Sequence, residues 1–300
     1  MRLKISSVLL FLLLSASAPV LVVGVAVAAE TVGTEQLSLQ QYLYWQQINQ
    51  ARMHPYSVLQ RLGISRTQAH EALGGDAWVL YFGLPPLAWS DSLCRVANAH
   101  GSDMIDRLYY SYITPEGDSP ADRVEQSGYE AHTVCEALGL FALGSYLPYE
   151  RAVTTMMDNL LRDELTGAAG ANRIVFSPAV TEVGIALFAE TLERVSGRPD
   201  IYLLVMDAAR PSLQRSTVVG QLDEGCSVVL YNLESGVAHD VAIYPGGWFQ
   251  FSPPSEGVEL VQFDAAGREI FQADYFQGDS PVPVYLDLRQ NVTVDENRVL

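Results

Sequence analysis

The spacing of apolar residues changes along the chain, and this change limits the folds that the sequence can adopt. In the first half, apolar side chains recur at helical intervals in three stretches, at residues 44–51, 93–104 and 153–161. A residue that favours the start of a helix precedes each stretch: Ser38, with Gln41 three positions later as in a capping box, then Ser90 and Pro148. The first half of the chain is therefore predicted to be mainly helical.

The period then shortens to that of β-strands. Residues 182–189 and 201–206 are predicted to form two strands, joined as a hairpin by the polar residues 190–200. Helices packed around a few strands predict an α+β domain with α/β/α layers, and we assign it to residues 35–210.

The sequence pattern changes after Arg210-Pro211. Short β-rich runs follow one another with turn residues between them: 217–221, 228–231, 241–244, 248–251, 258–263, 269–271 and 282–288. This pattern predicts a small all-β sandwich at residues 215–300. Its Gly-Gly turn before the aromatic strand resembles carboxypeptidase-regulatory and transthyretin-like sandwiches, and Trp248 and Phe251 are expected in the core.

The N-terminus has the features of an export signal. A short positive segment with Arg2 and Lys4 precedes the apolar residues 8–14, and small residues before Glu30 fit a cleavage site. We predict that residues 1–29 are a signal peptide and that the protein is secreted, periplasmic or on the cell surface. No stable membrane span is expected after cleavage. The alternative is an uncleaved anchor, because this stretch is long enough to cross a bilayer.

The charge of the chain excludes one class of partner. There are 35 acidic and 18 basic residues, and the formal net charge is −17. Nucleic-acid binding depends on several Lys or Arg side chains at phosphates, and the sequence has no basic cluster. We therefore expect no nucleic-acid partner. Lys4 is the only lysine, and loss of the leader would change the net charge to −19.

A series of short motifs follows in order along the first two thirds of the chain. They are Asn49-x-x-Arg52, Pro86-Leu87-Ala88-Trp89, Ala97-x-x-His100-x-x-Asp103-Met104, residues 111–123 with Gly128-Tyr129, Cys135-Glu136-Ala137, and Ser177-Pro178 with residues 181–184. Together they resemble the bacterial secreted branch of the CAP superfamily, the cysteine-rich secretory, antigen 5 and pathogenesis-related-1 proteins. The resemblance covers roughly residues 40–208 and implies the α/β/α-layered CAP fold.

The resemblance also implies a cleft, which in family members commonly holds two histidines and two acidic residues that can bind a divalent metal. Here Tyr112 stands at the first histidine position, and the region of Asn172 has no histidine for the second. Of that set only Glu136 is retained. A phenol and an amide are poor zinc ligands, so neither a metal nor any other cofactor is expected.

Five residues are candidates for the lining of the cleft: Tyr112, Glu136, His100, Tyr129 and Asn172. His100 lies on the apolar stripe of its helix. It is therefore either a buried histidine that ties the helix to a loop or a participant in cleft chemistry. Glu136 and His100 are the candidate catalytic residues.

Tyrosines are concentrated around the predicted cleft. Six of them lie within 41 residues: Tyr109, Tyr110, Tyr112, Tyr129, Tyr146 and Tyr149. They either fill loops and helix edges or form an amphipathic groove for a lipid, a glycan or an extended peptide.

The loop before Gly128 is rich in acidic residues. Its carboxylates could suit calcium, but Glu116, Asp118, Asp122 and Glu125 lack the ligand spacing of an EF-hand. Asp122 and Arg123 are predicted to form an ion pair that holds the loop.

The cysteines are too few for a disulfide-stapled fold. Cys94 and Cys135 lie in one predicted domain and could form a single disulfide after export, whereas Cys226 is expected to be a lone strand cysteine.

The sequence favours a secreted, non-enzymatic CAP protein that acts as a binding or interaction module for an unknown ligand or protein partner. One alternative is a hydrolase acting on peptide or cell-envelope material through Glu136 and His100, with Tyr112 as donor. Another is a lipid carrier.

Overall fold

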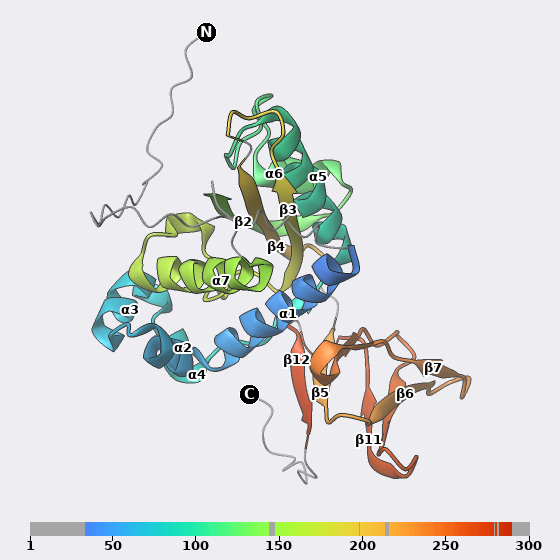
Figure 1. Ribbon diagram of the computed structural model, residues 1–300. Coiled ribbons are helices and arrows are strands. Elements are labelled where there is room, and N and C mark those ends of the chain that lie inside the picture. The colour runs from blue at the N-terminus through green and yellow to red at the C-terminus, as the bar shows by residue number, and fades with distance from the viewer. Residues whose placement is uncertain are drawn as a thin grey trace, which may run out of the picture. The chain divides into compact units, whose positions relative to one another are not determined.

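A four-stranded sheet with the order β1-β3-β4-β2 forms the centre of the first two thirds of the chain (Figure 1). Its strands are β1 (Ala88–Trp89), β2 (Ala131–Leu143), β3 (Glu182–Thr191) and β4 (Asp200–Pro211). β1 pairs with β3 in parallel, and the other neighbours are antiparallel. The predicted hairpin is therefore present as β3 and β4, and β2 is an edge strand.

The structure is a computed structural model that describes residues 34–143, 148–197, 199–213, 216–278, 280 and 282–289. The predicted signal peptide and Tyr146 lie outside these residues. The α-helices are α1 (Thr34–Met53), α2 (Pro55–Leu62), α3 (Arg66–Leu73), α4 (Val79–Phe82), α5 (Asp91–Arg107), α6 (Pro120–Gln126) and α7 (Tyr149–Thr166). Two 3-10 helices, η1 (Gly74–Asp76) and η2 (Gly170–Asn172), lie in the same region.

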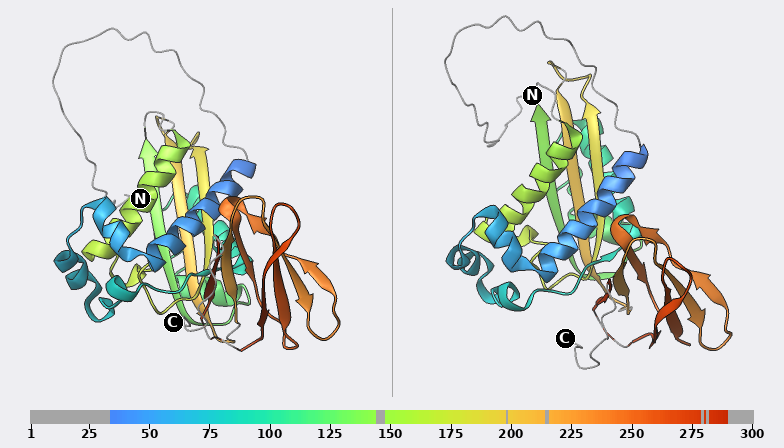
Figure 2. Two further views of the ribbon diagram at one scale, coloured as in Figure 1. Left: turned by 90° about the horizontal axis from the view of Figure 1, so that it is seen from below. Right: turned by 60° about the horizontal axis from the view of Figure 1, so that its bottom comes forward.

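Helices cover both faces of this sheet. Figure 2 shows α1 and α7 across one face and α5 against the other. Gly184 allows α5 to approach β3 closely, because a Cβ atom at this position would lie 2.1 Å from the backbone nitrogen of Cys94. The predicted α+β class with α/β/α layers is confirmed.

The predicted helix starts are correct in two of three cases. Ser90 caps α5 by accepting a hydrogen bond from the Leu93 backbone N–H at 3.5 Å, and Pro148 precedes the first residue of α7. Helix α1 instead begins at Thr34, so the predicted start at Ser38 is wrong. The segment before Ser38 contains residues with good helix propensity, and nothing in it stops the helix.

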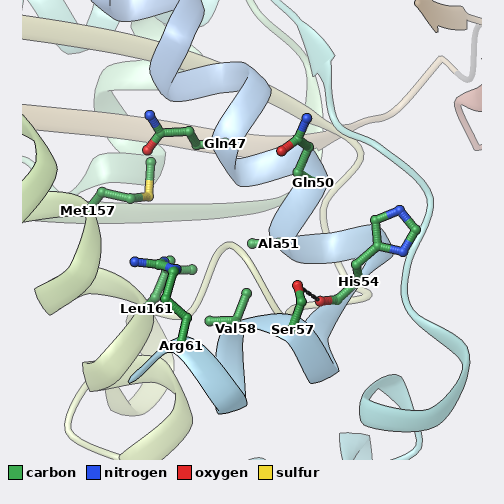
Figure 3. Close-up of a pocket in the computed structure, with 9 residues that line it drawn as sticks. All are labelled: Gln47, Gln50, Ala51, His54, Ser57, Val58, Arg61, Met157 and Leu161. Atoms are coloured by element: carbon green, nitrogen blue, oxygen red, sulfur yellow. Dashed lines mark hydrogen bonds between the residues drawn. The ribbon is translucent and has the colours of Figure 1, made fainter. Parts of the chain in front are cut away.

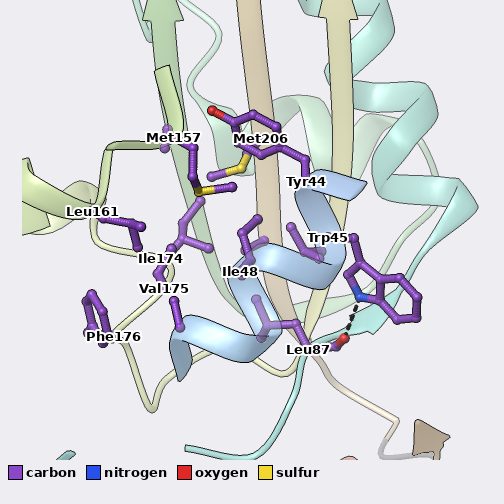
Figure 4. Close-up of a cluster of buried hydrophobic side chains, with 14 of the residues drawn as sticks. Tyr44, Trp45, Ile48, Leu87, Met157, Leu161, Ile174, Val175, Phe176 and Met206 are labelled. Atoms are coloured by element: carbon purple, nitrogen blue, oxygen red, sulfur yellow. Dashed lines mark hydrogen bonds between the residues drawn. The ribbon is translucent and has the colours of Figure 1, made fainter. Parts of the chain in front are cut away.

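The core between the sheet and the α1–α7 layer is aromatic and aliphatic. Figure 4 shows Tyr44, Trp45 and Ile48 of α1 within this cluster, together with Met157 of α7 and Met206 of β4. The indole N–H of Trp45 donates to the Leu87 carbonyl at 2.7 Å, so its polar atom is satisfied inside the core. The helical stripes of the sequence thus become the inner faces of α1 and α7.

Two fully buried charges hold the segment 174–177 in this core, and we call Arg52, Glu164 and this segment the Arg52–Glu164 clamp. The Glu164 carboxylate accepts hydrogen bonds from the backbone N–H groups of residues 174, 175 and 176 at 2.8–2.9 Å. The Arg52 guanidinium donates to the carbonyls of residues 174, 175 and 177 at 2.9–3.0 Å, and also to that of Pro85. The Asn-x-x-Arg motif is therefore structural in this fold.

The C-terminal region contains two further four-stranded sheets, ordered β11-β10-β6-β7 and β12-β5-β9-β8. The strands are β5 (Val218–Leu222), β6 (Ser227–Asn232), β7 (Ala238–Asp240), β8 (Ile243–Tyr244), β9 (Trp248–Phe251), β10 (Val258–Phe263), β11 (Glu269–Tyr275) and β12 (Val284–Leu288). Phe249 and Phe251 of one sheet share a core with Leu230 and Leu260 of the other. The predicted sandwich is confirmed as part of the fold class.

This sandwich contacts the α+β region through β9. The Gln250 side chain accepts from the Trp89 backbone N–H at 2.8 Å and donates to the Trp89 carbonyl at 2.9 Å. Trp248 is buried as expected, but it packs on Trp45, with ring centroids 5.6 Å apart, and belongs to the first core. The two regions form one compact unit by their contacts, and the division at residues 210–215 stays a prediction.

Candidate functional site

Four ionisable side chains meet between the sheet and the helices α5 and α6, and we call His100, Arg123, Glu136 and Asp207 the Glu136 cluster. Glu136 of β2 and Asp207 of β4 are directly opposite each other in the strand register. Cross-strand partners point to the same face of a sheet, here the face covered by α5. His100 is on α5, and Arg123 is on α6.

Glu136 is the centre of this cluster. Its Oε1 atom lies 2.8 Å from Nδ1 of His100 and accepts a hydrogen bond from Arg123 Nη2, also at 2.8 Å. A carboxylate only accepts, so the imidazole proton that faces Glu136 is on Nδ1. Nε2 of His100 has no hydrogen-bond partner among the described residues. The side chains of His100 and Glu136 are 0% exposed.

Asp207 has no donor for either of its carboxylate oxygens among the described residues. Burial raises its pKa well above the ordinary value, the neighbouring Glu136 carboxylate raises it further, and Arg123 opposes the shift. Asp207 therefore favours its protonated form. The hydroxyl of the protonated acid then donates toward Glu136. Two ionised carboxylates could not form this hydrogen bond, because both only accept.

Arg123 also holds the loop between α5 and α6. It donates to the carbonyls of Tyr112 at 3.0 Å and Asp118 at 2.9 Å. The predicted Asp122–Arg123 ion pair is wrong, because Asp122 instead forms a capping box with Ser119 at the start of α6. Neighbouring helical residues point in different directions, so Arg123 turns toward Glu136 and Asp122 toward the helix start.

A cavity of about 370 Å³ runs along the free edge of β2 beside α7 and η2, and we call it the β2 groove. Tyr110 and Tyr112 line it from the α5–α6 loop, and Asn172 lines it from η2. The Tyr112 phenol lies beside the Asn172 side chain and the Leu138 backbone, which both act to lower its pKa. Burial raises the pKa of Tyr112, and the Glu136 charge adds to this effect.

The five candidate cleft residues do not share one cavity. Tyr112 and Asn172 meet in the β2 groove, whereas His100 and Glu136 meet in the buried cluster. Tyr129 lies apart from both sites and donates from its hydroxyl to Glu182 at 2.7 Å. The two positions at which the family resemblance implies histidines are thus adjacent, but the retained glutamate is directed away from them.

The tyrosines also divide between the two predicted roles. Tyr110 and Tyr112 form a wall of the β2 groove. Tyr109 donates to Asp103 at 2.6 Å, Tyr129 donates to Glu182, and Tyr149 is buried in the core. Two of the five described tyrosines therefore have positions suited to a ligand, and the others are structural.

Asp207 is the member of the Glu136 cluster that the sequence motifs did not reveal. Its signal in the sequence is a charged residue directly after the apolar run 201–206, where the pattern predicts that the strand ends. The strand β4 in fact continues to Pro211, and Asp207 is 0% exposed within it.

Two other cavities flank these sites. One of about 400 Å³ between α5 and α6 is lined by His100 and Arg123, with Arg107 bound to Asp103 and Glu116 at its rim. Another of about 330 Å³ lies between α1, α2 and α7, where Gln47, Gln50 and Arg61 face solvent (Figure 3). No predicted site residue lines this second cavity.

The residues described in the structure contain no group of three or more His, Cys, Asp or Glu side chains that could hold a metal ion. The acidic loop side chains have other partners: Glu116 bonds Arg107, and Asp122 bonds Ser119. At the β2 groove, the phenol of Tyr112 and the amide of Asn172 do not fit a zinc site, because neither is a good zinc ligand.

Cys94, Cys135 and Cys226 are free in the structure, and the Cys94–Cys135 disulfide that the sequence left open is not formed there. Successive strand residues point to opposite faces of a sheet. Since Glu136 faces α5, Cys135 faces the α7 layer. There the charges of Glu164 and Arg173 act on the pKa of its thiol. Cys94 is on α5, at the other face.

The comparisons with known proteins agree with the motif series. Residues 45–191 match the family model CAP, described as the cysteine-rich secretory protein family. The chain carries a CAP domain. No curated protein sequence matches the chain.

Two solved structures resemble this chain at low similarity. An extracellular protein containing an SCP domain from Bacillus anthracis str. Ames is 16% identical, with a TM-score of 0.36 over 61% of this chain. The match spans 45% of that protein, less than half its length. An outer surface protein from Borrelia burgdorferi is 12% identical, with a TM-score of 0.35 over 57% of this chain and 92% of its own. Likeness at this level supports no inference about ligands or activity.

Among the described residues, no helix is both long and apolar enough to cross a membrane.

Proposed function

We propose that this chain is an extracytoplasmic, non-enzymatic binding module and that the β2 groove of its CAP domain is the ligand site. One observation carries the proposal: Tyr112 and Asn172 line an open groove, whereas His100 is buried and held by Glu136. The groove offers phenol and amide groups on an apolar surface, which suits recognition of a ligand better than proton transfer.

Binding is tested with variants of the groove. Tyr110 is 47% exposed, so Tyr110→Ala removes a groove wall without opening the core. Tyr81→Ala is the matched control, because Tyr81 is 65% exposed on α4 and lines no part of the groove. Native mass spectrometry of the exported protein is expected to detect a co-purified or added lipid, glycan or peptide that Tyr110→Ala loses and Tyr81→Ala retains. Equal retention by both variants would contradict the proposal.

The absence of a metal-dependent role is tested with Zn²⁺. We expect no saturable rise in melting temperature on titration, because the groove has no imidazole ligand. A large saturable rise that is lost in Glu136→Gln would overturn this part of the proposal.

The proposed location depends on the leader at residues 1–29. N-terminal sequencing of the protein from the culture medium or periplasm is expected to begin at Glu30. Recovery of the whole chain in the membrane fraction would support a retained anchor instead.

A hydrolase is the second candidate, because the 2.8 Å contact between Glu136 and His100 has the geometry of a base held by a carboxylate. The cavity lined by His100 lies between α5 and α6, and Tyr112 does not line it. Turnover of peptide or cell-envelope substrates that His100→Gln abolishes, without a fall in melting temperature, would favour this candidate.

A further inference from the structure

β2 is a long edge strand without the usual protection against pairing. It spans residues 131–143, and β4 is its only neighbour in the sheet among the described residues. Exposed edges in proteins are generally blocked by charged residues, proline or a covering element. Residues 137–142 of β2 contain neither a charge nor a proline. This part of the edge lies in the β2 groove.

The backbone alternation determines which groups face the groove. In an antiparallel pair, the N–H and C=O groups of alternate residues point away from the partner strand. The Val183 carbonyl accepts from Ser90, toward β1, so the alternate β3 residues 184 and 186 bond to β4. Val205, the β4 partner of residue 186, therefore points away from β2, and Leu138, which lies opposite Val205, points outward. The N–H and C=O of Leu140, two residues later, therefore also point outward. No residue outside the sheet in the described part of the chain bonds them.

Side chains that can contact a ligand lie on both sides of this strand edge. Tyr110 and Tyr112 lie on one side, and Met156, Leu160 and Asp163 of α7 lie on the other. Asp163 is the only charged residue that lines the groove, and its carboxylate has no hydrogen bond or ion pair with a described residue. An occupant thus meets an apolar surface, free backbone groups and one unpaired negative charge.

We propose that the β2 groove binds an extended peptide, which adds to β2 as a further strand and presents a basic side chain or its N-terminal ammonium to Asp163. This inference rests on the proposed function of the groove and specifies its ligand. Backbone hydrogen bonds at Leu140 supply affinity, and the tyrosine rings contact alternate apolar side chains. The charge of Asp163 selects cationic over anionic peptides.

The probe is a random heptapeptide library displayed on phage, selected on the whole exported chain and counter-selected on an unrelated protein. The most enriched peptide is then synthesised with lysine or glutamate at its charged position, and with N-methyl groups on either set of alternate residues. Fluorescence anisotropy measures the affinities. N-methylation of one set is expected to weaken binding by about tenfold or more, and of the other set by less than about threefold, since a strand pairs through one edge.

Two variants of the chain test the contacts. Leu140→Pro removes the outward N–H without removing a bond to β4, and it is expected to weaken binding by about tenfold or more. Leu140→Ala keeps that N–H and is the control, with an expected loss below about threefold. Asp163→Asn is expected to remove most of the preference for lysine over glutamate, whereas Glu125→Gln on α6 leaves it unchanged. Melting temperatures identify any variant that fails to fold.

The outcomes separate this inference from the proposed function. Equal affinity for both N-methylated peptides, or a folded Leu140→Pro variant that binds as well as Leu140→Ala, would overturn strand addition. If a lipid or glycan is then lost with Tyr110→Ala, the groove remains a binding site and only the peptide inference fails. If Tyr110→Ala affects no ligand of any class, both proposals fail.

Discussion

The two faces of the CAP-domain sheet each bury a cluster of charges, but the clusters are satisfied to very different extents. On the α7 side, Glu164 accepts three backbone N–H groups, and Arg52 donates to four backbone carbonyls. On the α5 side, both carboxylate oxygens of Asp207, Oε2 of Glu136 and Nε2 of His100 have no partner among the described residues. The first cluster is complete, and the second is not.

This difference in hydrogen bonding indicates different roles: the Arg52–Glu164 clamp is structural, whereas the Glu136 cluster can change its protonation state. A buried charge whose hydrogen bonds go to the backbone holds one segment in one conformation, and its loss leaves those backbone groups unpaired. A cluster with free polar atoms can change its protonation without losing its contacts. The Arg52–Glu164 clamp therefore explains why the chain folds around residues 174–177, and the Glu136 cluster is the part of the molecule expected to respond to pH.

The largest expected effect is at the clamp. Arg52→Met leaves four buried carbonyls without donors and removes a buried charge that interacts with Glu164. We expect the free energy of unfolding to fall by about 3–5 kcal/mol. Urea denaturation measures the change. Arg162→Met is the control, because Arg162 is exposed, and it should cost less than about 0.5 kcal/mol. Similar losses in both variants would contradict a specific role for the clamp.

The next largest effect is at Glu136. Glu136→Gln removes the charge that faces Arg123, but Arg123 keeps its two loop carbonyls. We therefore expect a loss of about 2–3 kcal/mol in unfolding free energy, less than at the clamp. Chemical denaturation is again the measurement, and Glu116→Gln on the exposed loop is the control. A loss equal to that of Arg52→Met would show that the two clusters do not differ.

Asp207→Asn is expected to cost little, in contrast to Glu136→Gln. A protonated Asp207 and a neutral amide both offer a donor toward Glu136, so the change near pH 4, before the unfolded carboxyl is fully ionised, should be below about 1 kcal/mol in either direction. The groups that act on Asp207 are Glu136 of β2 and Arg123 of α6, and Cys94 of α5 is also within electrostatic range. A loss as large as that of Glu136→Gln would mean that Asp207 is ionised in the fold.

The Asp207→Asn variant also isolates the contribution of Asp207 to the pH dependence of the unfolding free energy. Burial raises the folded pKa of Asp207 above its ordinary value of 3.8, so its contribution to stability is full below that pH and is lost as the pH rises through the raised pKa. The unfolding free energy of the wild type minus that of Asp207→Asn should therefore fall above about pH 4, by up to about 1.4 kcal/mol per unit. Urea melts from pH 4 to 8 measure it, and a flat difference would refute it.

The sequence predicted the elements with a clear period and missed partners that depend on register. The stripe on α5 and the apolar runs of β3 and β4 were readable because burial on one face imposes their spacing. β2 was not, since the residues of its groove segment are apolar on both faces and show no alternation. The contact of Glu136 with Asp207 depends on how β2 and β4 align, which a single sequence does not display.

Site residues show the same limit. His100 and Glu136 were chosen from motifs, and they do meet at 2.8 Å, but motifs cannot tell a buried pair from a cleft pair. Arg123 was paired with its sequence neighbour, whereas its partner is 13 residues away. The alternation of side chains along β2 directs Glu136 to one face of the sheet and Cys135 to the other. It therefore also determines whether Cys135 can reach Cys94.

The smallest expected effect concerns those cysteines. Because Cys94 and Cys135 belong to opposite faces of the sheet, we expect three free thiols in the purified, exported chain. Alkylation in denaturant without reductant, followed by intact mass spectrometry, should add three labels. In the folded state Cys94 should be alkylated slowly at neutral pH, since burial raises its pKa to about 12 and the thiolate is the nucleophile. A chain that takes one label would contain a disulfide. It would require β2 or α5 to lie differently, and the distinction between the two charge clusters would no longer hold.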